Sequence, residues 1–251
     1  MFANINSMVN GFLAVVKGRN DMYNMSQAFI FTHQFTIWGL GDKTMGFNNV
    51  SELNALHLDA LREIGNIGSG NAATALSSML NIPVDIEIPV ISLVNYENVS
   101  QYLGGKDQEV IGLALGLEED LEGVMLHVVQ PQFASRIVNT FYPKEIHTLS
   151  DISDMDLSAV KETSNITTAS YVNSLAKLTN MFINITPPDD YLGTVENVLQ
   201  KAASRFDAIG QQVIYIDESM FIADTEIKSS MILILQIDSL HKLFERLGLP
   251  D

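Results

Sequence analysis

The sequence predicts an α+β domain with pseudo-two-fold symmetry, in which a central, mainly antiparallel sheet carries one long helix from each half. Two observations lead to this fold class. A polar motif occurs twice with a constant offset of 99 residues, and short apolar segments separated by polar turns follow each copy. An internal repeat indicates one structural unit used twice. Short strands joined by tight turns favour antiparallel pairing.

The repeated motif lies in the stretches LDALREIGNIGSGNAATALSSML and LSAVKETSNITTASYVNSLAKLT. Each copy has an acid or a serine, then a glutamate, an asparagine and a distant proline at the same spacing. The matched pairs are Asp59 and Ser158, Glu63 and Glu162, Asn66 and Asn165, and Pro89 and Pro188. One copy alone would be interpreted as an ordinary solvent-facing surface. By residue usage its chance odds are on the order of one in a few hundred, so two copies in register argue for a function.

Each motif copy is expected to form a helix with one polar stripe. At about 100° per residue, Asp59, Glu63, Asn66 and Gly70 fall within about 60° of one another. The opposite face is expected to be buried, and its members are Leu58, Leu61, Ile64, Gly65, Gly68, Ala72, Ala75 and Leu76. Each glycine costs about 1 kcal/mol in a helix. We therefore interpret the two inward glycines as permitting close packing against a sheet, and Gly70 as leaving room for another molecule.

The second helix repeats this geometry with a different inward face. Ser158, Glu162, Asn165 and Ala169 are expected to point outward. The residues expected inward are Leu157, Val160, Ser164, Thr167, Tyr171 and Leu175. Because the glutamate and the asparagine are kept while the inward residues differ, the outward pattern is interpreted as functional.

The segments after each helix are expected to form the sheet. In the first half they are PVDIEIPVISLV, EVIGLALGL, a polar turn EEDLEG and GVMLHVVQ, followed by a helix that begins near Pro131. In the second half they are MFINITPP, an amphipathic stretch TVENVLQKAASRFDAIG, and the strand-like QQVIYI, MFIADTEI and SSMILILQI. A closing helix, DSLHKLFERLG, ends at Gly248. The two repeats cover about 51–148 and 151–248 of a single domain, residues 45–251.

The composition excludes several classes of function. The 251 residues contain no cysteine, which rules out disulfides, thiolate metal ligands and a cysteine nucleophile, and is typical of a protein from the reducing cytoplasm. The formal net charge of -16 would repel a polyanion, so no nucleic-acid partner is expected. No apolar run reaches the roughly 18 residues of a membrane span, and the five histidines are scattered, so neither membrane insertion nor a metal site is expected.

Glutamate and asparagine on one helix face suit phosphoryl transfer better than nucleophilic catalysis. An amide has one acceptor and two donors but is a poor nucleophile. It can orient an attacking water, which is a main task in phosphoryl transfer. The glutamate can pair with a cation on a partner. The phosphate, its metal and its lysine would then come from that partner.

These features resemble the CheC/CheX/FliY family of chemotaxis phosphatases. The doubled motif and the wording EIGNIGSGNAATAL carry the resemblance, which covers about residues 51–248. It implies a CheC-like tandem-repeat fold and, as substrate, the aspartyl phosphate of a CheY-type response regulator. It also implies that Asn66 and Asn165 orient water for in-line attack, while Glu63 and Glu162 pair with the receiver's active-site lysine.

The resemblance further implies the cofactor and the partners. Mg²⁺ would belong to the receiver, and this chain is expected to bind no cofactor. CheD, a receptor deamidase that the family binds, is expected as a second partner that modulates the activity. Asp59, Ser158, Pro89 and Pro188 complete the motif without an assigned chemical role.

Two other functions stay open at this point. One is a binding module that captures CheD or the phosphorylated receiver without appreciable hydrolysis, which the altered ETSNITTASY of the second copy favours. The other is a structural part of the flagellar motor. It has less support, because the chain leaves no room for the rotor-associated domain of FliY-like members.

Residues 1–44 fit neither repeat and carry a charge of +1, whereas the remainder carries -17. One interpretation is a start codon assigned too far upstream, with the native product beginning at Met45. Purine-rich codons for Gly41 and Asp42 would then serve as its ribosome-binding site. The alternative is a genuine N-terminal extension, such as a partner-binding segment.

We expect the natively expressed protein to begin at Met45, because residues 1–44 match no part of the repeat. Intact-mass measurement of the native product checks this start. A mass near 27.7 kDa, the value for the whole chain, would contradict it and favour the extension.

Overall fold

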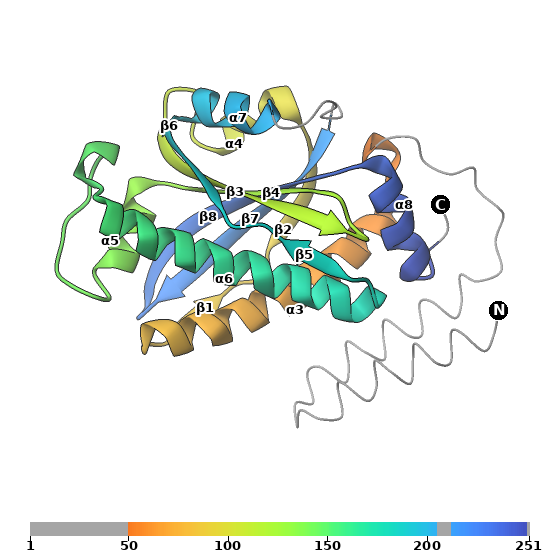
Figure 1. Cartoon of the computed structure of the whole chain (residues 1–251), viewed down its shortest axis with the longest axis horizontal. Helices are drawn as coiled ribbons and strands as arrows, with labels where there is room; N and C mark the ends of the chain where they lie inside the picture. The colour runs from red at the N-terminus through yellow and green to blue at the C-terminus, as the bar shows by residue number, and fades with distance from the viewer. Residues whose placement is uncertain (1–49, 205–211, 250–251) are drawn as a thin grey trace. The chain divides into compact units, whose positions relative to one another are not determined.

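The computed structural model describes residues 50–204 and 212–249 (Figure 1). The prediction about residues 1–44 and Met45 lies outside these residues, as does the end of the amphipathic stretch, residues 205–210. Helices and strands succeed one another in the same order in both halves of the described chain. The predicted α+β fold with tandem repeats and two long helices is confirmed.

The helices of the two halves correspond in pairs. They are α3 (Ala55–Leu80) and α6 (Asp154–Thr179), α4 (Val99–Tyr102) and α7 (Val195–Ala203), and α5 (Pro131–Val138) and α8 (Ile237–Arg246). Short 3-10 turns are η1 (Val50–Glu52), η2 (Tyr96–Asn98) and η3 (Leu149–Asp151). The two long helices begin and end 99 residues apart, as the motif offset predicted.

The strands also correspond in pairs. They are β1 (Val84–Ile86) and β5 (Ile183–Ile185), β2 (Val90–Asn95) and β6 (Asp189–Thr194), β3 (Glu109–Glu119) and β7 (Gln212–Ile222), and β4 (Gly123–Val129) and β8 (Thr225–Leu235). The offset of 99 continues through β2 and β6, and becomes 103 between β3 and β7.

The eight strands of the described chain form one antiparallel sheet in the order β1-β7-β8-β4-β3-β5, with β2 also on β7 and β6 also on β3. The first strands of each repeat therefore pair with the third strand of the other repeat. Strands β4 and β8 meet at the centre. Because of this interleaving, each half completes the sheet of the other.

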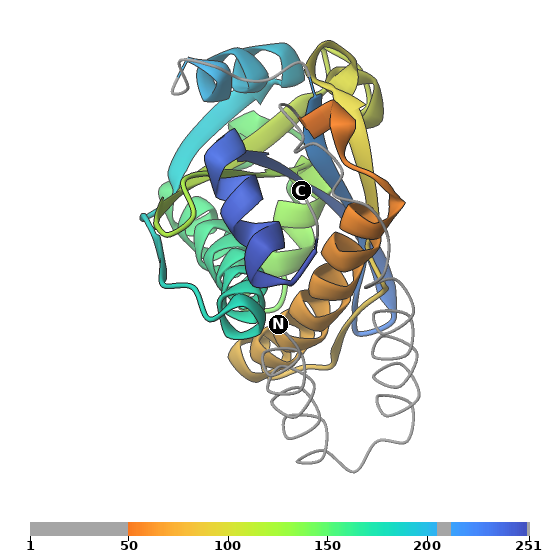
Figure 2. The same cartoon turned by 90° about the vertical axis from the view of Figure 1, so that its right-hand side faces the viewer.

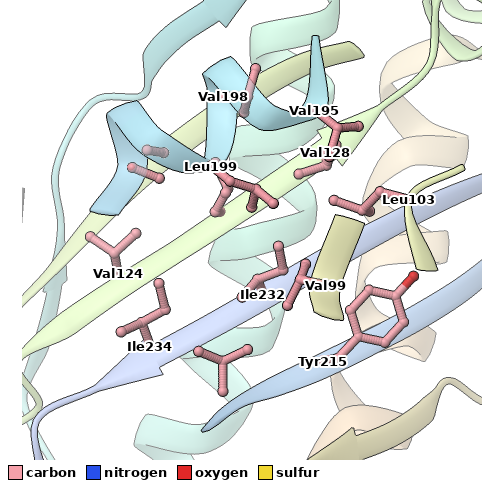
Figure 3. Close-up of a cluster of buried hydrophobic side chains, with 14 of the residues drawn as sticks. Val99, Leu103, Val124, Val128, Val195, Val198, Leu199, Tyr215, Ile232 and Ile234 are labelled. Carbon is pink, nitrogen blue, oxygen red and sulfur yellow. The ribbon is translucent and has the colours of Figure 1, made fainter. Parts of the chain in front are cut away.

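The long helices α3 and α6 lie on one face of the sheet, and the short helices α4 and α7 lie on the other (Figures 1 and 2). Successive side chains of a strand point to opposite faces, so each face has its own apolar cluster. On the face of α7, Val195, Val198 and Leu199 pack over Val128 and Ile232 (Figure 3). The other cluster joins the C-terminal turns of α3 to α5 and the sheet.

Two strand predictions differ from the structure. The segment MFIADTEI, predicted as one strand, contains the end of β7, a tight turn at Ala223 and Asp224, and the start of β8. Both turn residues have positive φ, 45° and 64°. Two such residues match the twist of a hairpin, although the sequence lacks the usual glycine or asparagine. The run PVDIEIPVISLV is split into β1 and β2 at Pro89, which has no N–H to donate.

The two long helices begin and end alike. The side chains of Asn54 and Ser153 cap their N-termini by accepting hydrogen bonds from backbone N–H groups. Asn81 and Asn180 end them in the left-handed conformation, both with φ of 54°. Asparagine tolerates that conformation better than most residues, so both long helices end with the same kind of C-cap.

The distance between α3 and α6 depends on Gly68. A Cβ on this residue would lie 2.7 Å from Cδ1 and 3.0 Å from Cα of Tyr171 in α6. Real Cβ atoms do not approach other atoms so closely, so the ring of Tyr171 occupies the space that any side chain on Gly68 would need. The expectation that both inward glycines face a sheet is wrong for Gly68, which faces the second helix.

Gly65 does face the sheet. A Cβ there would lie 2.9 Å from Cδ1 of Ile91 in β2 and 3.2 Å from Cγ of Pro89. The third glycine, Gly70, has no atom within 4 Å of an added Cβ, so it borders open space as predicted.

Replacing Gly68 with alanine should destabilise the fold by about 1–3 kcal/mol, because overpacking against Tyr171 exceeds the roughly 1 kcal/mol gained in helix propensity. Gly70→Ala is the matched control, and should stabilise the fold by up to about 1 kcal/mol. Urea unfolding of both variants measures the two changes. Equal stabilities, or the reverse order, would contradict the close contact at Gly68.

Candidate functional site

The first polar stripe consists of Asp59, Glu63, Asn66 and Gly70, on the side of α3 that faces away from the core. Asp59 and Gly70 are exposed, whereas Glu63 and Asn66 are half-buried. Six of the eight residues expected on the opposite face are buried, which confirms the predicted orientation of the helix. The two that are only half-buried are Leu58 and Ala75.

The carboxylate of Glu63 is poised for a cation. Partial burial raises the pKa of the Glu63 carboxyl above its usual value, and Glu63 has no ion pair among the described residues. Arg62, its neighbour, is already paired with Asp59 at 2.6 Å, and both side chains of that pair are exposed. A desolvated carboxylate gains more than an exposed one from a charged partner. An incoming ammonium group would therefore stabilise the ionised form of Glu63.

The second polar stripe consists of Ser158, Glu162, Asn165 and Ala169 on α6. Ser158 and Glu162 are exposed, and Asn165 and Ala169 are half-buried. The inward residues are buried except Leu157, which is half-buried. The structure thus presents Glu and Asn of both copies at the surface, on neighbouring helices of one face of the sheet.

The surroundings of the two stripes differ. On the second helix, Nζ of Lys161 lies 2.5 Å from Oδ1 of Asp190 in β6. By the offset of 99, Asp190 corresponds to Ile91, which instead packs at Gly65. An ion pair therefore joins α6 to β6, whereas an apolar contact joins α3 to β2, the corresponding strand of the first repeat.

The motif prolines lie between the first two strands of each repeat, Pro89 between β1 and β2 and Pro188 between β5 and β6. Pro89 is buried, and its ring approaches α3 at Gly65. Pro188 is half-buried at the equivalent turn between β5 and β6. The fixed φ of proline stiffens such a turn, so the part of Pro89 in the motif is to hold this turn against the motif helix.

The sequence analysis missed a buried carboxylate beneath the stripes, that of Glu218 in β7. Glu218 is 1% exposed, and its Oε1 accepts a hydrogen bond from the hydroxyl of Tyr171. Its Oε2 accepts one from Oγ of Ser229 at 3.2 Å. Burial raises the pKa of Glu218 to about 7, against the opposing effect of these hydrogen bonds. Strand parity could have found it, since it shares a face with Ile214, Ile216, Met220 and Ile222.

Tyr171 connects this buried carboxylate to the first stripe. Its ring lies against α3 at Gly68, where an added Cβ would be 2.7 Å from Cδ1 of Tyr171. Burial and the charge of Glu218 raise the pKa of the Tyr171 hydroxyl. On α3 itself, Oγ of the buried Ser69 donates a hydrogen bond of 2.9 Å to the main-chain carbonyl of Asn66. Glu218 therefore reaches the backbone near Asn66 through the ring of Tyr171.

Two histidines of the described chain, His57 and His127, pack against aromatic rings. The ring of His57 stacks near that of Phe244, with centroids 4.4 Å apart. His127 is fully buried beside Phe133, and burial lowers its pKa to about 4. Across residues 50–204 and 212–249, no three His, Asp or Glu side chains are placed to hold a metal ion. None of the helices described is long and apolar enough to cross a membrane.

Comparison with known proteins connects both stripes to one family. The model of the CheC-like family matches residues 56–93 and 155–189, which contain the two motif copies. The CheY-P phosphatase CheC of Bacillus subtilis is 30% identical over 206 residues, which is 80% of this chain and 97% of that protein. The flagellar motor switch phosphatase FliY of Bacillus subtilis is 29% identical over 140 residues, which is 55% of this chain and 36% of that protein.

The fold has a close counterpart among solved structures. The crystal structure of Thermotoga maritima FliY matches with a TM-score of 0.64 and 25% identity, covering 78% of this chain and 98% of that one. The interleaved sheet with two long helices is therefore a fold that a solved protein shares.

Replacing Glu218 with glutamine should flatten the pH dependence of stability. Its pKa is about 7 when folded and returns toward 4.5 on unfolding, so the folded state binds the proton more tightly. The stability from this group is present below about pH 4.5 and is lost as the pH rises through about 7. Thermal unfolding from about pH 5 to about pH 8 should show a larger loss for the parent than for Glu218→Gln. Exposed Glu118→Gln is the control, and parallel curves for all three proteins would contradict the prediction.

Proposed function

This chain belongs to the CheC-like family, and we propose that it is a phosphatase that hydrolyses the aspartyl phosphate of a CheY-type response regulator. The observation that carries the proposal is the pair of stripes, which present Glu and Asn together on α3 and on α6. Relatives that match the chain over most or part of its length are named CheY-P phosphatase and motor switch phosphatase.

The asparagines are proposed to orient the attacking water. Asn66 and Asn165 are half-buried, so each amide reaches the surface from a restricted position. In the reaction the water oxygen attacks phosphorus, the bond from phosphorus to the aspartyl oxygen breaks, and the carboxylate leaves. An amide cannot replace water as the nucleophile, but it can hold the water in line with the leaving oxygen.

The glutamates are proposed to fix the receiver on the helix. Glu63 is the better supported of the two, because it is partly desolvated and has no ion pair in the described chain. The receiver's lysine would be its partner, and charge-assisted hydrogen bonds are about twice as strong as neutral ones. Open space at Gly70 leaves room for a loop of the receiver one turn beyond Asn66.

The receiver is proposed to supply Mg²⁺, because phosphoryl transfer needs charge neutralisation that two acidic stripes cannot provide. CheD is proposed as a second partner that modulates the activity, which membership of the family supports. The cytoplasm is the proposed site of action, in agreement with a chain that has no cysteine.

Phosphate loss from a phosphorylated CheY-type receiver, followed with catalytic amounts of this protein, tests the proposal. We expect the parent to accelerate the loss. Asn66→Ala and Asn165→Ala should each reduce the contribution of one stripe by about 10²-fold, and the double variant should return the decay to its spontaneous rate. Asn197→Ala, on α7 at the opposite face of the sheet, is the matched control and should behave as the parent does.

Turnover separates the phosphatase from a binding module. A catalyst clears an excess of phosphorylated receiver, whereas a module that only captures the receiver or CheD saturates at stoichiometric amounts. If the parent leaves the decay unchanged both with and without CheD, the phosphatase function is wrong for this chain. The binding module then takes its place.

A further inference from the structure

We infer that Tyr171 and Glu218 are positioning residues for the first stripe, and that the second stripe has no equivalent support. The inference rests on the proposed phosphatase function, and makes the two stripes unequal. Neither side chain reaches the surface, so both act through the backbone of α3.

Tyr171 is anchored at both ends. Its ring is 3% exposed and lies against the backbone of α3 at Gly68, two residues after Asn66. Its hydroxyl donates to the carboxylate of Glu218, which Ser229 holds from the next strand. The tyrosine therefore connects the motif helix of the first repeat to the third strand of the second.

The ring of Tyr171 reaches the turn of α3 that follows Asn66. Gly68, which the ring contacts, lies two residues after Asn66, and Oγ of Ser69 donates to the carbonyl of Asn66 in the same turn. A ring whose hydroxyl is held by a buried hydrogen bond restricts the position of the helix that packs on it. Because the amide of Asn66 projects from this backbone, its direction depends on where Tyr171 is held.

Apolar packing alone gives α3 less definition. An apolar cavity lies between the two motif helices and the sheet, and Gly65, Ile91, Tyr171 and Ile216 are among the residues that line it. Side chains that border a void lose contacts on one side. The contact of Gly68 with Tyr171, whose hydroxyl is held by Glu218, is therefore the directed constraint on the position of α3.

The second stripe lacks each part of this device. By the offsets of 99 and 103, the residue that corresponds to Tyr171 is Ala72, and the one that corresponds to Glu218 is Leu115. Thr168 corresponds to Ser69, but its Oγ1 is buried with no hydrogen-bond partner among the described residues. The same holds for Oγ of Ser164. Ala72 of α3 therefore gives Asn165 no counterpart of the support that Tyr171 gives Asn66. Helix α6 is joined to the sheet by Tyr171 itself and by the half-exposed pair of Lys161 and Asp190.

Single-site backgrounds test the inference. Asn165→Ala leaves only the first stripe, and Asn66→Ala leaves only the second. Tyr171→Phe keeps the ring against Gly68 and removes only the hydroxyl. In the Asn165→Ala background we expect it to lower kcat for the phosphorylated receiver by about tenfold with little change in KM. In the Asn66→Ala background kcat should stay within about twofold of its own parent.

Changes at Glu218 provide a second, independent measurement. Glu218→Gln keeps an acceptor for the Tyr171 hydroxyl and should retain most of the first-stripe kcat. Glu218→Leu copies Leu115, the corresponding residue of the first half, and should lose about as much as Tyr171→Phe. Tyr215→Phe is the matched control, since its buried hydroxyl bonds Ser230 at 2.8 Å. It should leave first-stripe kcat unchanged.

The outcomes are distinct. Equal losses of kcat at both stripes, or a change confined to KM, would show that the pair only stabilises the fold and would overturn the inference. Unchanged kcat in Tyr171→Phe and Glu218→Leu would overturn it as well. If the parent is inactive as well as both single-site backgrounds, the proposed phosphatase function fails and the inference falls with it. An active parent with two inactive backgrounds would show that the stripes act together, and would overturn the inference alone.

Discussion

The contact between Gly68 and Tyr171 is the constraint on which the two polar stripes depend. The contact leaves no room for a Cβ, so it fixes how closely α3 and α6 approach. At the positions related by the pseudo-two-fold, the residues are Thr167 and Ala72, both fully buried. In both pairs the smaller residue belongs to α3 and the larger to α6, so the contact between the two helices is not symmetric.

The interleaved sheet explains how one repeat supports the stripe of the other. Strand β7 belongs to the second repeat, yet it pairs with β1 and β2 of the first. Its residues Ile214 and Ile216 line the apolar cavity together with residues of both α3 and α6. Tyr171 and Glu218 are both second-repeat residues, and both serve the backbone near Asn66. In a duplicated fold with strands exchanged in this way, one repeat can lose the activity of its own stripe. Its strands are still needed to support the stripe of the other repeat.

The sequence predicted most of the fold because the information was local or repeated. Helical spacing and the offset of 99 located α3 and α6, and their outward and inward faces agree with the burial of their residues. The Ala223–Asp224 turn was missed because its positive φ values come without glycine or asparagine. The contact of Gly68 with α6 required tertiary structure, since a helical wheel cannot tell a strand from another helix. Glu218 was missed because the predicted strands QQVIYI and MFIADTEI are separated by the polar residues Asp217, Glu218 and Ser219, so strand parity was not extended through them.

The glycines of α3 are consistent with a helix that its surroundings hold in place. Three glycines cost about 1 kcal/mol each in helix propensity, and α6 has serine, threonine and alanine at the same three positions. Helix α3 is thus the weaker helix by its own residues and depends more on tertiary contacts, which Ile91, Pro89 and Tyr171 supply. Such a helix can be set in one orientation by a few directed hydrogen bonds. Helix α3 is also the helix that packs on Tyr171, the partner of Glu218. Gly65 and Gly68 lower its helix propensity, and the same two glycines allow its close contacts with Ile91, Pro89 and Tyr171.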